Sequence, residues 1–149
     1  MRRPETKEER VDTNVGGVVQ APLYAAFDGG PGTCVHARES TAVFLNTLTA
    51  HTPARSDSAA DTVLLVVSEL VTNAVRHAPG PLVLILHAEP GRVRISVRDT
   101  STDLPAPRTP DLVSGNGGFG WPTIIQYLAN TVEVVPRPGG KEIHAVLPW

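Results

Sequence analysis

The sequence predicts a two-layer α+β sandwich, in which a mixed, mainly antiparallel sheet carries helices on one of its faces. Two observations lead to this prediction. Apolar residues recur with helical spacing in three segments and with strand-like patterns in five others. Along the chain these segments run strand, helix, helix, strand, strand, helix, strand, strand, which is typical of a sheet with its helices on one side.

Length and composition favour one domain. The chain has 149 residues, and we expect a disordered, apolar-poor segment over 1–17 and a single domain over 18–149. A net charge of -2 and a pI near 6.2 give no electrostatic case for nucleic-acid binding. No apolar run reaches the length of a membrane span. The single cysteine, Cys34, fits a reducing compartment, so we expect a soluble, cytoplasmic protein with no membrane partner.

The first elements are a strand and a helix. Apolar and aromatic residues over 18–27 predict the strand, and Pro22 places it at an edge of the sheet, because proline has no N–H to donate to a neighbouring strand. Apolar residues at helical spacing predict the helix over 33–50, with Thr33 as a candidate N-cap.

A central helix follows and carries two polar residues of interest. It is predicted to begin at Ser56 or Ser58 and to stop before Pro79, which cannot continue a helix. Glu69 and Asn73 are four residues apart and therefore share a face of this helix. Polar groups carried into a mostly apolar helix need partners, which a bound metal, water or phosphate would supply. A solvated stripe on an amphipathic helix is the alternative.

Two strands are predicted next, over 82–88 and 93–99, joined by a hairpin turn. Apolar residues alternate with polar ones along the second strand, so one of its faces is expected to be buried. Asp99 ends this strand at an inward position. An ordinary turn residue would also explain an aspartate there.

The last part of the chain combines a loop, glycines, a helix and a hairpin. The segment 100–114 is polar and proline-rich, which predicts a long irregular loop of the kind that is often functional. Four glycines follow it and precede a predicted helix over 122–129, whose N-terminal N–H groups would favour an anion such as phosphate. A flexible loop is the alternative reading of the glycines. Strands over 131–135 and 142–147 are predicted to form the final hairpin.

In combination, these features resemble the GHKL (Bergerat-fold) ATP-binding family, and within it the short anti-sigma factor serine kinases of the RsbW and SpoIIAB type. The segment 67–78 is similar to the N-box of that family nearly residue for residue. The other matching stretches are Val97-Arg98-Asp99-Thr100-Ser101 for the first glycine box, Gly115-Asn116-Gly117-Gly118-Phe119-Gly120 for the second, and Pro138-Gly139-Gly140-Lys141 for the terminal hairpin.

The resemblance implies a Bergerat fold, the cofactors ATP and Mg²⁺, and a set of site residues. Asn73 would be the Mg²⁺ ligand, which suits the preference of that ion for oxygen. Glu69 would be the general base, and Asp99 would accept a hydrogen bond from the adenine amino group. The remaining nucleotide-binding residues that it implies are His77, Ser101, Gly115, Gly117, Gly118, Phe119, Gly120 and Lys141.

The resemblance also implies a function. It indicates a serine/threonine kinase that phosphorylates an anti-anti-sigma partner of the STAS type and sequesters a sigma factor when unopposed, with homodimerisation expected. A catalytically silent ATP-binding module that regulates a partner by docking alone is the alternative. Three departures keep this alternative open: Thr100-Ser101-Thr102 stands where many members carry a glycine, the bulky and stiff Trp121-Pro122 directly follows the second glycine box, and Lys141-Glu142 stands where many members place a threonine.

Overall fold

Five strands form one antiparallel sheet in the computed structural model, which describes residues 20–103 and 121–149. Their order across the sheet is β1-β2-β3-β5-β4, and each of the four pairings is antiparallel. The strands are β1 (Leu23–Phe27), β2 (Leu82–Glu89), β3 (Arg92–Asp99), β4 (Thr131–Arg137) and β5 (Gly140–Pro148).

The α+β prediction is confirmed, and its description of the sheet as mixed is corrected. α3 (Trp121–Leu128) lies between β3 and β4 in the chain, and these two strands run in the same direction. If β3 and β4 were neighbours in the sheet, they would form a parallel pair. They are not neighbours, because β5 lies between them and pairs antiparallel with both. The two helices between β1 and β2 return the chain to the end of the sheet that it left, so that pair is antiparallel as well.

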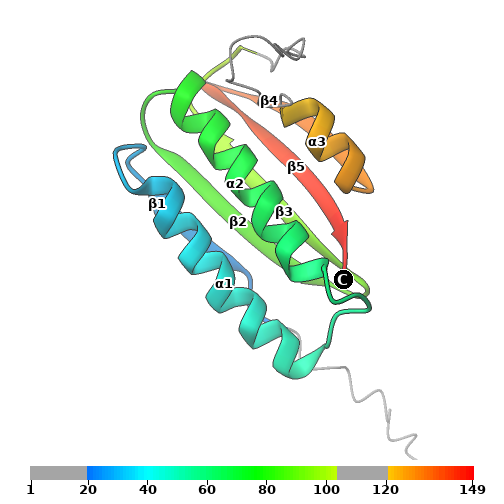
Figure 1. Ribbon diagram of the computed structural model, residues 1–149. Coiled ribbons are helices and arrows are strands. Elements are labelled where there is room, and N and C mark those ends of the chain that lie inside the picture. The colour runs from blue at the N-terminus through cyan, green and yellow to red at the C-terminus, as the bar shows by residue number, and fades with distance from the viewer. Residues whose placement is uncertain (1–19, 104–120) are drawn as a thin grey trace, which may run out of the picture.

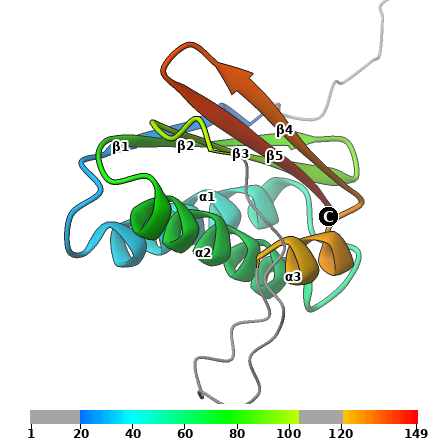
Figure 2. The same ribbon diagram turned by 90° about the horizontal axis from the view of Figure 1, so that it is seen from above.

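Three helices cover one face of the sheet: α1 (Thr33–His51), α2 (Ala59–His77) and α3 (Trp121–Leu128). Figure 2 shows all three on the same side, and Figure 1 shows α2 between α1 and α3. The core lies between the two layers. Among the described residues, no helix is long and apolar enough to cross a membrane.

The central helix, α2, forms because its apolar residues repeat on the face that meets the sheet. Side chains that are at most 2% exposed define that face: Val63, Val66, Val67, Leu70, Val71 and Ala74. Burying a valine or leucine side chain contributes about 1.5–3 kcal/mol, so this stripe fixes the helix on the sheet. Ser58 is the N-cap residue, as predicted, although its side chain makes no capping hydrogen bond. The helix ends at His77, just before Pro79.

The predicted start of β1 and the predicted N-cap of α1 are wrong, and β4 and β5 each extend two residues further into their hairpin turn than predicted. β1 begins at Leu23, directly after Pro22 and not at residue 18. The N-cap of α1 is Gly32, whose φ of 87° makes a left-handed turn into the helix, so Thr33 is the first helical residue. The Thr33 hydroxyl instead donates to the carbonyl of Gly30 at 2.8 Å. The edge position predicted for β1 is confirmed.

Three of the segments predicted from the sequence lie wholly or partly outside the residues that the structure describes. The disordered segment predicted over 1–17 and the part of the predicted loop beyond residue 103 lie outside the described residues. The glycine-rich stretch 115–120 lies outside them as well.

Candidate nucleotide site

The predicted polar residues come from α2, from the end of β3 and from the start of β5, which the topology brings to one end of the fold. Four residues separate the end of α2 from the start of β2, and Val83 of β2 pairs with Arg98 near the end of β3. The hydroxyl of Thr100 donates to the carbonyl of Pro79 at 3.4 Å, which links the segment after β3 to the segment after α2. The end of α2 and the end of β3 are therefore neighbours.

Glu69 and Asn73 lie on the flank of α2, between its buried stripe and its exposed side. Both are half-buried, whereas Leu65 and Arg76 on the outer side of the helix are exposed. Within residues 20–103 and 121–149, neither side chain makes a hydrogen bond or an ion pair. Their oxygens are one helical turn apart and are available to a ligand.

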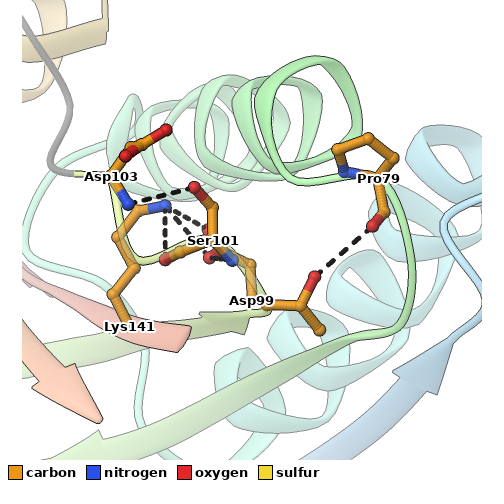
Figure 3. Close-up of polar contacts among 6 residues, drawn as sticks. Pro79, Asp99, Ser101, Asp103 and Lys141 are labelled. Atoms are coloured by element: carbon orange, nitrogen blue, oxygen red, sulfur yellow. Dashed lines mark hydrogen bonds and ion pairs between the residues drawn. The ribbon is translucent and has the colours of Figure 1, made fainter. Parts of the chain in front are cut away.

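Asp99 and Lys141 form a buried ion pair on the helix-covered face of the sheet. They are direct partners in the register of β3 and β5, and they are 5% and 3% exposed. The Lys141 ammonium donates to Asp99 Oδ1 at 3.0 Å and also lies 3.0 Å from Oδ2, where the direction is not that of a hydrogen bond. Figure 3 shows the two side chains pointing at one another.

Ser101 completes this arrangement. Its backbone N–H donates to Asp99 Oδ1 at 3.0 Å, and its carbonyl accepts from Lys141 Nζ at 3.4 Å. Asp99 Oδ1 thus takes two hydrogen bonds, whereas the buried Oδ2 takes none from any described residue. A buried carboxylate oxygen without a donor is costly, so a ligand that donates to Oδ2 would be favoured.

The hairpin before β5 explains why Lys141 lies opposite Asp99. A Cβ on Gly140 would lie 2.0 Å from the backbone oxygen of Asp99, so only glycine lets β5 begin so close to the end of β3. Gly139 has a φ of 75°, which a side chain would strain, and it makes the turn that sets the register. The two glycines of the stretch Gly139-Gly140-Lys141 therefore place the ammonium of Lys141 next to Asp99.

A charged cluster on the opposite face of the sheet was not predicted. The carboxylate of Glu142 is 5% exposed, and it accepts from Arg98 Nε at 3.1 Å and pairs with Arg137 Nε at 2.6 Å. These two arginines border a hollow of about 430 Å³ at the same end of the sheet. The sequence did contain an indication of this cluster, because side chains alternate along a strand and Arg98 therefore lies on the face away from Asp99.

The other site residues implied by the resemblance lie in three different places. His77 is the last residue of α2 and is exposed. Ser101 and Lys141 are brought together with Asp99, as described above. The second glycine box lies outside the described residues: Gly115, Gly117, Gly118, Phe119 and Gly120.

The residues present fit a magnesium nucleotide. A carboxamide oxygen beside a carboxylate, with phosphate oxygens and water completing the shell, is a donor set that Mg²⁺ accepts. The open acceptor on Asp99 fits an N–H donor on a base.

Comparison with known proteins agrees with these features. Residues 31–147 match the family model of the histidine kinase-like ATPase domain. No curated protein matches the chain. Among solved structures, the RsbU and RsbW domains of Rv1364c from Mycobacterium tuberculosis superpose with a TM-score of 0.60 at 19% identity, over 87% of this chain and 33% of that one. At that identity the superposition shows the fold alone.

A second solved structure is more distant. The histidine kinase domain of the blue-light activated histidine kinase EL346 from Erythrobacter litoralis gives a TM-score of 0.45 at 18% identity, over 75% of this chain and 60% of that one. The chain thus spans about one third of the Mycobacterium tuberculosis chain and less than two thirds of the Erythrobacter litoralis chain.

Proposed function

Because this chain belongs to the histidine kinase-like ATPase family, we propose that it transfers the terminal phosphoryl group of Mg-ATP to a serine or threonine of a protein partner. We propose further that the partner is an anti-anti-sigma protein of the STAS type, and that the unopposed protein sequesters a sigma factor in the cytoplasm as a homodimer. Family membership supports ATP use, and the choice of partners rests on the resemblance of the chain to anti-sigma factor kinases.

Nucleotide binding is supported by the acceptor on Asp99. An adenine amino group can donate one hydrogen bond to Oδ2, which takes none from the described residues. The surrounding contacts hold this carboxylate in place, because Lys141 and Ser101 both donate to Oδ1. In this proposal the base is read at the ends of β3 and β5.

Phosphoryl transfer is assigned to α2. The oxygen of Asn73 would hold Mg²⁺, which supplies charge neutralisation at the phosphates when it is bound. The carboxylate of Glu69 would accept the proton of the attacking hydroxyl as the hydroxyl oxygen bonds to the terminal phosphorus and the bond from that phosphorus to the oxygen of ADP breaks. The observation that carries this proposal is that the two side chains are half-buried, one turn apart, and make no bond within the described part of the chain.

The test is transfer of labelled phosphate from ATP to STAS-type proteins of the source organism. We expect the wild type to phosphorylate at least one of them and Glu69→Gln to phosphorylate none, while both bind ATP. Glu39→Gln is the matched control, because Glu39 is an exposed glutamate on α1. If ATP binds but the wild type phosphorylates no partner, the chain acts as a docking module and the kinase proposal is wrong.

A further inference from the structure

The ion pair between Asp99 and Lys141 has an asymmetry that its structural role does not require. A pair that only tied β3 to β5 would be most stable with both carboxylate oxygens hydrogen-bonded. Here both available donors, the Lys141 ammonium and the Ser101 N–H, bond to Oδ1. Oδ2 is buried and has no hydrogen bond from the described residues, although the ammonium lies 3.0 Å away.

We propose that Lys141 is a positioning residue that selects the base of the nucleotide, by fixing the Asp99 carboxylate so that only Oδ2 is open. This inference rests on the proposed nucleotide site and adds a residue that decides its specificity. Lys141 supplies the counter-charge that a buried carboxylate needs, with its ammonium 3.0 Å from each oxygen of Asp99. It also fixes the orientation of the carboxylate, because its side chain is only 4% exposed and has little room to move.

The second contact of Lys141 supports a role at the site. Its ammonium also donates to the carbonyl of Ser101 at 3.4 Å, while the hydroxyl of Ser101 accepts from the N–H of Asp103 at 3.2 Å. Lys141 therefore holds the first residues after β3 as well as the carboxylate (Figure 3). A single side chain sets both the acceptor and the backbone beside it.

A single open oxygen has a consequence for the choice of purine. Adenine offers one exocyclic amino group at position 6, which matches one acceptor. Guanine has a carbonyl at position 6, and its two adjacent donors, N1–H and the 2-amino group, match a carboxylate with both oxygens open. Because Oδ1 is already filled, the pair is suited to adenine and poorly suited to guanine.

The experiment compares ATP with the triphosphate of purine riboside, which lacks the 6-amino group, by calorimetry on the full chain. For the wild type we expect about a 10- to 100-fold preference for ATP, because the analogue leaves a charged buried acceptor unpaired. For Lys141→Met we expect that preference to fall at least about fivefold, because the Asp99 carboxylate loses the charge-assisted hydrogen bond that fixes its orientation. Affinity for the analogue should change little.

Two further variants separate base recognition from folding. Lys141→Arg keeps the cation and should keep most of the preference for ATP. The double variant Asp99→Asn with Lys141→Met removes both charges, so it can be measured if Lys141→Met alone does not fold. Its preference for ATP over the analogue should also be reduced. Arg92→Met is the matched control, because Arg92 is an exposed cation at the other end of β3 and should leave the preference unchanged.

The outcomes are distinct. If Lys141→Met and the double variant keep the wild-type preference for ATP, Lys141 only stabilises the sheet and the inference is wrong, while the proposed nucleotide site stands. If the wild type binds ATP and the analogue equally, Asp99 does not read the amino group and the inference is also overturned. If the wild type binds neither nucleotide, the inference and the proposed function are both wrong.

Discussion

The two polar pairs of this protein are opposites in how they are held. Asp99 and Lys141 are buried, bonded to one another and fixed by the register of two neighbouring strands. Glu69 and Asn73 are half-buried on the flank of a helix and make no bond within the described residues. In the proposed function this difference is a division of labour: the sheet would supply a preformed acceptor for a base, while the helix would supply oxygens whose partners arrive with the ligand.

The difference follows from where each pair lies. A buried charge must be paired, since an isolated ion in the interior costs several kcal/mol after relaxation. Lys141 meets this requirement for Asp99 before any ligand binds. On α2 the side chains keep contact with solvent, so they can remain without protein partners at little cost. Four substitutions and one change of nucleotide test this contrast.

The largest expected effect concerns the base. If Asp99 accepts from the adenine amino group, GTP places a carbonyl against a buried carboxylate oxygen, and sites built on such a hydrogen bond discriminate by about 10⁴ or more. Calorimetric titration of the full chain with Mg-ATP and Mg-GTP measures the ratio. Equal affinities would remove Asp99 from base recognition and leave the pair with a structural role.

The next effect concerns chemistry on the helix. Glu69→Gln should lower the rate of phosphoryl transfer by about 10²–10⁴ and leave ATP affinity near that of the wild type, since the amide keeps the shape but cannot accept the proton. Single-turnover assays with a phosphorylatable partner, together with ATP titration, separate the two quantities. A matching loss of rate and affinity would mean that Glu69 binds ATP and does not act as the base.

Removing one partner of each pair should affect stability very differently. Asp99→Ala leaves the Lys141 ammonium buried without a counter-charge, which should lower the free energy of unfolding by about 3–5 kcal/mol. Asn73→Ala removes a half-buried side chain with no described bond, so its effect should be within about 0.5 kcal/mol. Urea unfolding measures both. Similar losses in the two variants would contradict the contrast.

Asn73→Ala should nevertheless reduce binding. Because the proposal makes this oxygen the protein ligand of Mg²⁺, the variant should lose the part of its ATP affinity that depends on the ion. ATP titrations with Mg²⁺ and with EDTA measure that part. An affinity that responds to Mg²⁺ as strongly as in the wild type would exclude Asn73 as the ligand.

The smallest effect on nucleotide binding is expected on the opposite face of the sheet. Arg98 pairs with Glu142, but its side chain is 41% exposed, so Arg98→Ala should change the free energy of unfolding by about 0.2–1 kcal/mol. ATP affinity should not change, because this side chain lies on the face away from Asp99. A large loss of affinity would mean that the site extends through the sheet.

The sequence was sufficient for local features. The apolar repeat of α2 predicted the helix and its polar flank, because burial on one side leaves a period of 3.6 residues in the sequence. Alternation along β3 predicted the inward position of Asp99. Both features depend on residues within one element.

Features that join distant elements were not predictable in the same way. The bonds between Asp99 and Lys141 depend on the register of β3 with β5, which the turn at Gly139 and the close approach of Gly140 determine. Burial of Glu142 on the face without helices depends on the two arginines that pair with it from other strands. The N-cap of α1 depends on a left-handed glycine, which leaves Thr33 inside the helix.

We expect the two polar pairs, one on α2 and one at the end of β3 and the start of β5, to belong to a single nucleotide site. The most direct measurement follows the ¹⁵N-labelled full chain by NMR during titration with Mg-ATP, watching the Asn73 side-chain amide and the Ser101 backbone N–H, which bonds to Asp99. We predict that both signals shift with the same dissociation constant, and that omitting Mg²⁺ weakens the response of Asn73 most. A response at only one of them, or at neither, would contradict it.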